Sequence, residues 1–314
     1  MSTSVTPASG WLGFRTPSLR FLYGWAVANL AANVLLVVTG GAVRVTGSGL
    51  GCPTWPQCGD GKYTPPMTYH GVIEFGNRML TWLLVAIAVA TWVAAMRYRP
   101  VDHVARRLAT LVALGVPLQA VIGGITVLTK LNPWVVAFHF LATILIISLA
   151  TWMVYRTRPN VATDPDEVPV PRDSVIARLA TALAITVYAI TWTTIYLGTV
   201  VTGSGPHSGD EDSHRNNLDP VLATQLHADA VWALLGTGFA LLLLAVIARL
   251  AMQRSAWWFA GILLLQGVIG YVQYSTGLPV ILVVLHMFGS ALLMIGATVL
   301  LLQAVDADRT RETA

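Results

Sequence analysis

The 314-residue chain carries little charge for its length: 11% of its residues are Asp, Glu, Lys or Arg, whereas 55% are hydrophobic. A soluble domain has about 25% charged residues, so this deficit excludes a chain whose surface mostly contacts water. The net charge of +4 is small and scattered between apolar runs, which excludes the concentrated basic surface that nucleic-acid binding needs. The lipid bilayer is therefore the expected solvent for most of the chain.

Cysteine is nearly absent as well, since Cys52 and Cys58 are the only two. Two thiols without a neighbouring histidine or further cysteine supply half of a structural zinc site, so zinc is not expected. Their C-x5-C spacing fits a small disulfide in an oxidising compartment, a redox-active thiol pair, or two unlinked cysteines. The disulfide is favoured, and the other two interpretations stay open.

Apolar runs of roughly 20 residues are long enough to cross a hydrocarbon core of about 30 Å as helices. The first run is too long for a cleaved signal peptide, so we expect a retained helix there. The pattern predicts an all-α, polytopic membrane protein with eight transmembrane helices. They are expected near residues 22–43, 71–96, 105–128, 133–155, 175–200, 221–248, 256–276 and 279–304.

Lysine and arginine orient these helices. If the N-terminus is inside, the outer segments hold only Arg44, Lys62, Lys130 and Arg215. The inner segments hold Arg15, Arg20, Arg97, Arg99, Arg106, Arg107, Arg156, Arg158, Arg172, Arg178, Arg249, Arg254, Arg309 and Arg311. Cytoplasmic loops are enriched in these residue types. We therefore expect a multi-pass plasma-membrane protein with both termini cytoplasmic and the cysteine loop outside.

An internal repeat divides the chain. The segment from Gln119 to His139 resembles that from Gln266 to His286, and Val-Thr-Gly-Ser-Gly occurs at 45–49 and again at 201–205. The repeat predicts two pseudo-symmetric four-helix bundles, residues 1–158 and 175–314, joined by a proline-containing hydrophilic linker at 159–174. Transporters also contain parallel repeats of this kind, so the repeat alone does not define function.

Three histidines lie inside apolar helices: His139, His227 and His286. Each is expected roughly 10 Å below the outer surface at about 1.5 Å per residue, and Asn77 lies at the same depth of the second helix. A lone intramembrane histidine is often satisfied by an interhelical hydrogen bond. Three at one depth, tied to a repeat, favour axial ligation of heme iron. Asp229 is expected on a different helical face, as a packing or hydrogen-bonding residue.

Glu74 is a carboxylate inside the membrane, which is costly and marks a candidate functional site. It lies three residues before Asn77, on the same helical face. One interpretation is a Glu74–Arg78 ion pair that only stabilises the helix end. The other is a proton-handling group beside a bound substrate, with Arg78 and Arg44 meeting heme propionates.

Residues 40–58, Gly-Gly-Ala-Val-Arg-Val-Thr-Gly-Ser-Gly-Leu-Gly-Cys-Pro-Thr-Trp-Pro-Gln-Cys, are similar to the first helix end and outer loop of heme A synthases. Residues 73–78, Ile-Glu-Phe-Gly-Asn-Arg, resemble that family's second-helix motif, which is usually Glu-x-x-His-Arg. The four-plus-four helices and the histidines of the fourth, sixth and eighth helices also correspond, so the resemblance covers nearly the whole chain.

The resemblance implies an oxidoreductase that converts the C8 methyl group of heme O to the formyl group of heme A, by successive hydroxylations and loss of water from the diol. Terminal oxidases require the product for their assembly. The expected partners are the heme O substrate, a heme O synthase and an electron acceptor. The cysteine pair matches the family's loop cysteines.

The same resemblance implies a heme b cofactor held by His227 and His286 in the C-terminal half. The substrate heme is expected in the N-terminal half, near Glu74 as catalytic residue and His139 as iron ligand. Asn77, Arg78 and Arg44 are expected to complete the substrate site.

Asn77 departs from the family pattern, which generally has histidine at this position. Asparagine is a poor iron ligand but a competent hydrogen-bond partner, so His139 is expected to be the only strong ligand of the substrate heme. The alternative function is a di-heme b-type cytochrome carrying electrons between quinol and an extracytoplasmic partner. It would need two strong ligands for each heme, which Asn77 does not supply. A transporter has no use for ligands at one depth.

Overall fold

The computed structural model describes residues 16–59, 61–65, 67–159, 175–211 and 213–309. Within these ranges it contains eight α-helices and no β-strand. The helices are α1 (Leu19–Val45), α2 (Tyr69–Arg97), α3 (His103–Leu128), α4 (Pro133–Thr157), α5 (Val175–Ser204), α6 (Pro220–Ile247), α7 (Gln253–Ser275) and α8 (Val280–Arg309).

All eight helices are long and apolar enough to cross a membrane, so the predicted fold class and number of spans are confirmed. The largest differences from the predicted bounds are at the ends of α5 and α8, which continue to Ser204 and Arg309. Of the predicted linker 159–174, all but Pro159 lies outside the described residues.

Short polar side chains cap the starts of five helices. The first backbone N–H groups of a helix have no intrahelical partner, and Ser, Thr, Asp and Asn supply an acceptor for them. Proline at the first helical position, as at Pro133 and Pro220, removes one such donor. The capping residues are Ser18, Thr68, Asp102, Asn132 and Asp219.

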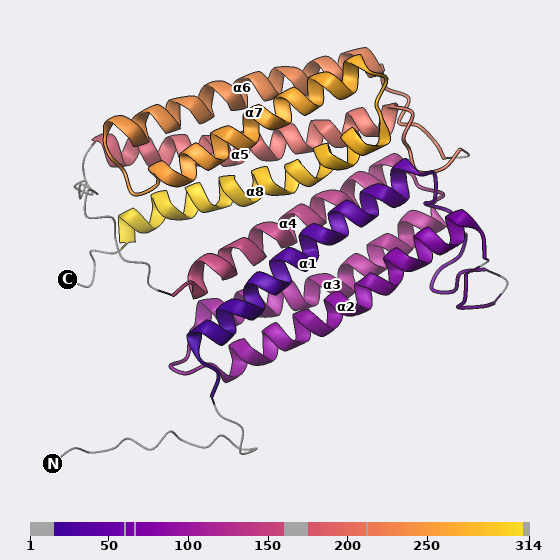
Figure 1. Cartoon of the computed structure of the whole chain (residues 1–314), viewed down its shortest axis with the longest axis horizontal. Helices are drawn as coiled ribbons and strands as arrows, with labels where there is room; N and C mark the ends of the chain where they lie inside the picture. The colour runs from indigo at the N-terminus through magenta and orange to yellow at the C-terminus, as the bar shows by residue number, and fades with distance from the viewer. Residues whose placement is uncertain (1–15, 60, 66, 160–174, 212, 310–314) are drawn as a thin grey trace.

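The helices form two groups of four, α1–α4 and α5–α8, which lie one above the other in Figure 1. In the first group α1 and α3 each contact α2 and α4, and in the second α5 and α7 each contact α6 and α8. Helices α2 and α4 are therefore diagonal partners, as are α6 and α8. The groups meet through α1 and α4 on one side and α5 and α8 on the other. Pseudo-symmetry between them stays a prediction.

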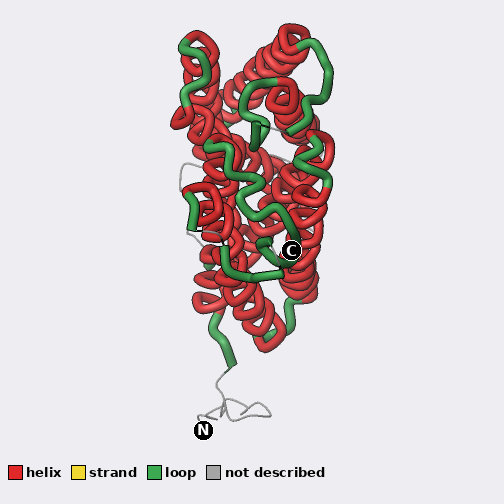
Figure 2. The backbone as a smooth tube through the Cα atoms, turned by 90° about the vertical axis from the view of Figure 1, so that its right-hand side faces the viewer, coloured by secondary structure: helices red, strands yellow, loops and turns green. Residues whose placement is uncertain are grey.

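The segments 46–68 and 205–219 lie at the same end of the bundle, which we call the disulfide end. That end faces the viewer in Figure 2, where loops cross the helix ends. Gly49 N–H donates to the Gly209 carbonyl at 2.9 Å, so the two segments are in direct contact. The even-numbered helices all begin at this end.

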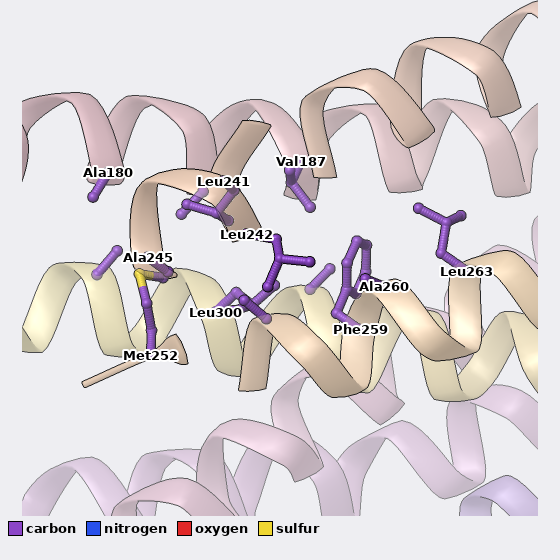
Figure 3. Close-up of a cluster of buried hydrophobic side chains, with 14 of the residues drawn as sticks. Ala180, Val187, Leu241, Leu242, Ala245, Met252, Phe259, Ala260, Leu263 and Leu300 are labelled. Carbon is purple, nitrogen blue, oxygen red and sulfur yellow. The ribbon is translucent and has the colours of Figure 1, made fainter. Parts of the chain in front are cut away.

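In the core of the second group a large side chain packs closely against glycine residues. Phe259 is 1% exposed, and Figure 3 shows its ring inside the cluster of α5–α8 side chains. A Cβ atom would come within 3.3 Å of this ring at Gly238 and within 3.0 Å at Gly296. The two glycines therefore make the room that the phenyl ring fills.

The contact between the groups combines apolar and polar packing. Ile144, Ile147 and Met294 are fully buried there. The Ser148 hydroxyl lies 2.9 Å from the Tyr188 hydroxyl and 3.0 Å from the Thr298 hydroxyl. Hydroxyl groups inside a membrane protein are commonly satisfied in this way, by bonds from helix to helix.

Replacing Phe259 by alanine should destabilise the protein strongly, by about 3 kcal/mol, because the ring is enclosed and its neighbours cannot fill the void. The neighbouring Trp258 is 67% exposed, so Trp258→Ala is the matched control with little expected loss. Reversible unfolding in mixed micelles measures both. Equal losses in the two variants would contradict this account of the core.

Candidate functional site

Two imidazoles meet inside the second helix group. His227 on α6 and His286 on α8 have ring centroids 6.3 Å apart and ring planes at 78°. Because α6 and α8 are diagonal partners, the rings approach each other across the middle of the group. Two imidazoles that bind one metal ion from opposite sides through bonds of about 2 Å have ring centres about 6 Å apart. The observed spacing fits that requirement.

Hydrogen bonding sets the protonation of the His227 ring. Its Nδ1 lies 3.0 Å from the Thr194 carbonyl oxygen, which can only accept, so Nδ1 must carry the hydrogen. The other ring nitrogen, Nε2, then keeps its lone pair and is free to bind a metal. The buried Nδ1 of His286 has no hydrogen-bond partner in the described part of the chain.

Glycines keep the space beside both rings open. A Cβ atom at Gly198 would lie 3.2 Å from Cε1 of His227, and one at Gly270 would lie 3.3 Å from Cε1 of His286. Both contacts would be tight, so larger residues would push on the rings. The spacing, the free ring nitrogen and the glycines together fit a heme with two axial histidines.

The first helix group holds one imidazole in a similar setting. His139 on α4 lies against Gly123 of α3, where a Cβ atom would be 3.4 Å from its Cε1. Its buried Nδ1 has no hydrogen-bond partner among the described residues. The His139 carbonyl accepts bonds from Thr143 Oγ1 at 3.0 Å and from Gln119 Nε2 at 3.3 Å. The glutamine of the sequence repeat thus holds the turn that carries the histidine.

Asn77 on α2, the diagonal partner of α4, has a different bonding pattern. The Thr39 hydroxyl donates to Asn77 Oδ1 at 2.8 Å. The amide oxygen is therefore engaged, and the amide nitrogen keeps two donors for other groups. The first helix group thus offers one imidazole and one amide where the second offers two imidazoles.

Glu74 is buried and bonded through both carboxylate oxygens. Its Oε1 forms an ion pair with Arg78, 2.5 Å to Nη2 and 3.2 Å to Nε. Its Oε2 accepts the backbone N–H of Cys52 at 2.6 Å. The i,i+4 ion pair that the spacing allowed is present, and the same carboxylate also holds the loop that follows α1.

Arg78 fastens this loop further. Its guanidinium donates to the carbonyls of Cys52 at 3.0 Å, Thr54 at 3.2 Å and Gln57 at 3.3 Å. Charge-assisted hydrogen bonds of this kind are stronger than neutral ones. Glu74 and Arg78 therefore act as one clamp on the loop.

The loop itself is closed by a disulfide between Cys52 and Cys58, as the sequence favoured. Both cysteines are buried. The Trp55 indole lies against Gly124, where a Cβ atom would come 2.5 Å from the nearest ring atom. Since Gly123 touches His139, the loop reaches the helix that lines the histidine site.

Arg44 lies at the junction of the two halves. Its Nε donates to the His207 carbonyl at 2.7 Å and its Nη2 to the Thr202 carbonyl at 3.3 Å. The sequence grouped Arg44 with Glu74 and Arg78, but these hydrogen bonds of Arg44 go to the end of α5 and the segment after it. Its role at a substrate site stays a prediction.

Sequence reasoning missed three partners of the site: Thr39, Thr194 and Gly198. Thr39 and Thr194 act through hydrogen bonds from one helix to another, for which no local pattern exists. Gly198 had a weak signal, because glycine also lies beside the other two intramembrane histidines. The described chain brings His227 and His286 together, and Glu74 and Arg78 together.

These features define a polytopic α-helical membrane protein that carries histidines within its helix bundles. Residues 23–72 and 67–298 match the family COX15-CtaA, described as cytochrome oxidase assembly protein. The chain belongs to this family.

Similar proteins carry the name heme A synthase. The one from Symbiobacterium thermophilum is 36% identical over 125 residues, 39% of this chain and 40% of that protein. The one from Geobacillus thermodenitrificans is 33% identical over 137 residues, 42% of each chain. The one from Listeria welshimeri is 28% identical over 194 residues, 58% of this chain and 59% of that protein. The chain thus spans about half of the length of these curated relatives.

Removing the clamp should loosen the disulfide loop. Arg78→Gln deletes the bonds to three loop carbonyls, and reduction of Cys52–Cys58 by a water-soluble dithiol should become at least about tenfold faster, since each charged hydrogen bond contributes roughly 1.5–3 kcal/mol. Trapping the released thiols with a maleimide reports the rate. Arg99→Gln, a change at the opposite end of α2, is the control. Equal rates in both variants and the parent would show that Arg78 does not restrain the loop.

Proposed function

We propose that this protein is a heme A synthase, which oxidises the C8 methyl group of heme O to the formyl group of heme A for terminal oxidase assembly. Each of two hydroxylations would take its oxygen from water, release two protons and pass two electrons from the methyl carbon to the electron acceptor. The resulting diol would lose water to leave the formyl group. The observation that carries the proposal is the unequal pair of sites. His227 and His286 form a complete ligand pair, whereas His139 is accompanied by Asn77.

Residues 175–314 form the cofactor half in this proposal. His227 and His286 would hold heme b, which supplies one-electron transfer when bound. The Thr194 carbonyl keeps the His227 hydrogen on Nδ1, so Nε2 would be the neutral nitrogen available to the heme iron. Gly198 and Gly270 keep the two rings free to align.

Residues 1–158 form the substrate half. His139 would be the only strong ligand of heme O, because an amide is a weak ligand for iron. The free amide hydrogens of Asn77 would donate to the substrate or to bound water instead. A site with one strong ligand suits a heme that must react and then leave.

Glu74 is the proposed proton-handling residue. Its Oε1 is held by Arg78, so Oε2 is the atom that would exchange the Cys52 N–H for a hydroxyl of the reacting carbon and take up its proton. Arg78 positions this carboxylate. Arg44 and Arg78 are the proposed contacts for substrate propionates at the disulfide end, and Arg78 would release the Thr54 and Gln57 carbonyls to make this contact.

The disulfide end would face the extracytoplasmic side of the plasma membrane, with both termini in the cytoplasm. The excess of arginine in the segments at the opposite end supports this orientation. A heme O synthase would deliver the substrate, and an electron acceptor would take electrons from the cofactor half. The Ser148–Tyr188–Thr298 contact between the helix groups supports the two halves working as one unit.

The competing function is a di-heme b-type cytochrome between quinol and an extracytoplasmic partner. The His227–His286 pair would serve it equally well. It would also need a second durable heme, for which Asn77 is unsuited. The identity of the extracted pigment separates the two functions.

Co-expression with a heme O synthase, in a host that makes no heme A, should produce heme A, detected by chromatography of extracted hemes. Glu74→Gln should lower the yield at least about a hundredfold, the usual size of a lost proton-transfer group, while the b-type spectrum persists. Glu211→Gln, in an exposed loop, is the control. Two tightly held b hemes and no heme A would favour the cytochrome.

His227→Ala and His286→Ala should each abolish the b-type pyridine hemochrome signal of the purified protein, because one strong axial ligand is lost. Membrane insertion and yield should stay normal. His214→Ala, in an exposed loop, should keep the full signal. Retention of the parent spectrum in both core variants would refute the ligand assignment.

A further inference from the structure

Asp229 on α6 is a carboxylate on the outside of the bundle. Three charged residues of the described helices lie five or more residues from a helix end: Glu74, Arg78 and Asp229. Glu74 and Arg78 pair with each other. Asp229 is exposed, and its side chain faces away from the other helices.

Asp229 lies well within the span. It is nine residues after Pro220, where α6 begins, which is about 13 Å along the helix axis at about 1.5 Å per residue. The 28 residues of α6 measure about 42 Å, roughly 12 Å more than the hydrocarbon core. If the excess is shared between the ends, the carboxylate lies about 7 Å inside the hydrocarbon.

The described residues only partly satisfy the hydrogen-bonding and charge requirements of the Asp229 carboxylate. Gln225 Nε2 donates to Asp229 Oδ1 at 2.9 Å, and no Lys, Arg or His of the described residues lies within ion-pair distance of it. Ionisable residues inside membranes almost always face a protein interior and pair with a partner. Asp229 is a lipid-facing carboxylate without a cation, so this surface of α6 lacks a cationic partner.

The same face of α6 carries small exposed residues that leave room for a second helix. Ala233, Gly236 and Ala240 are exposed and follow Asp229 at helical spacing, so they form one stripe. A Cβ atom at Gly236 would meet nothing within 4 Å. Small residues in a row let another helix backbone approach closely. Trp232, 72% exposed, lies beside the stripe and would border the contact.

We propose that the stripe from Gln225 to Ala240 binds a transmembrane helix of another membrane protein, one that carries Lys or Arg in the bilayer half near the disulfide end. Charge complementarity selects this occupant. In a two-fold pair of copies related by an axis along the membrane normal, Asp229 would face Asp229 at equal depth, and like charges repel. The heme sites play no part in this proposal.

The test uses the full-length protein in phospholipid vesicles and a synthetic single-span Leu/Ala peptide with one Lys at the matching depth. Energy transfer between labelled protein and labelled peptide measures binding. The same peptide with Leu in place of Lys is the ligand control. Asp229→Leu should weaken binding of the Lys peptide at least about tenfold, as for loss of one partner of a desolvated charge pair.

Two further variants keep the test decisive. Gly236→Leu retains the carboxylate but fills the groove, and it should also weaken binding. Thr193→Leu removes a polar group from an exposed position of α5 and should leave binding unchanged. Equal binding of the Lys and Leu peptides, or no effect of Asp229→Leu, overturns the proposal. Energy transfer between two copies of the protein that Asp229→Leu abolishes and the Lys peptide does not displace also overturns it, and assigns the face to a second copy.

Discussion

Hydrocarbon offers no hydrogen-bond partner, so every polar group in the eight spans must be bonded by the chain or by something that the chain binds. Helix formation satisfies the backbone, and the capping side chains satisfy the helix starts. Ser148, Tyr188 and Thr298 satisfy one another where the halves meet. Among the described residues eight buried side-chain atoms have no hydrogen-bond partner, and the ring nitrogens of His139 and His286 are two of them. Two of the three proposed heme-ligating histidines therefore carry a ring nitrogen that the described residues leave unbonded.

Hydrogen bonds beside the proposed heme ligands have opposite polarity in the two halves. In the second half a backbone carbonyl, that of Thr194, accepts a ring N–H and so leaves a lone pair for metal. In the first half the Thr39 hydroxyl donates to the amide oxygen of Asn77, which leaves the amide N–H groups of Asn77 for other acceptors. One bond leaves a ring lone pair available, and the other leaves amide N–H donors available.

Much of this architecture follows from local pattern. Apolar runs of membrane length predict the spans, the spacing of Glu74 and Arg78 predicts their ion pair, and the repeat indicated that His139 and His286 hold comparable places. Contacts between distant segments have no such signal. Three such contacts depend on how the loops fold over the helix ends. The Cys52 N–H donates to Glu74, the Trp55 ring packs on Gly124, and Arg44 bonds to the carbonyls of Thr202 and His207. The expected contact with heme propionates grouped Arg44 with Arg78, whereas the hydrogen bonds of Arg44 link the two halves.

The clamp on the cysteine loop also links a covalent bond to the charges of α2. Four of the groups that bond to Glu74 and Arg78 belong to the segment that the Cys52–Cys58 bond closes. The disulfide therefore limits the movement of the carbonyl and N–H partners of a buried carboxylate and its guanidinium. A bond between two thiols in a loop thus preorganises the surroundings of two charged side chains on a helix of membrane-spanning length.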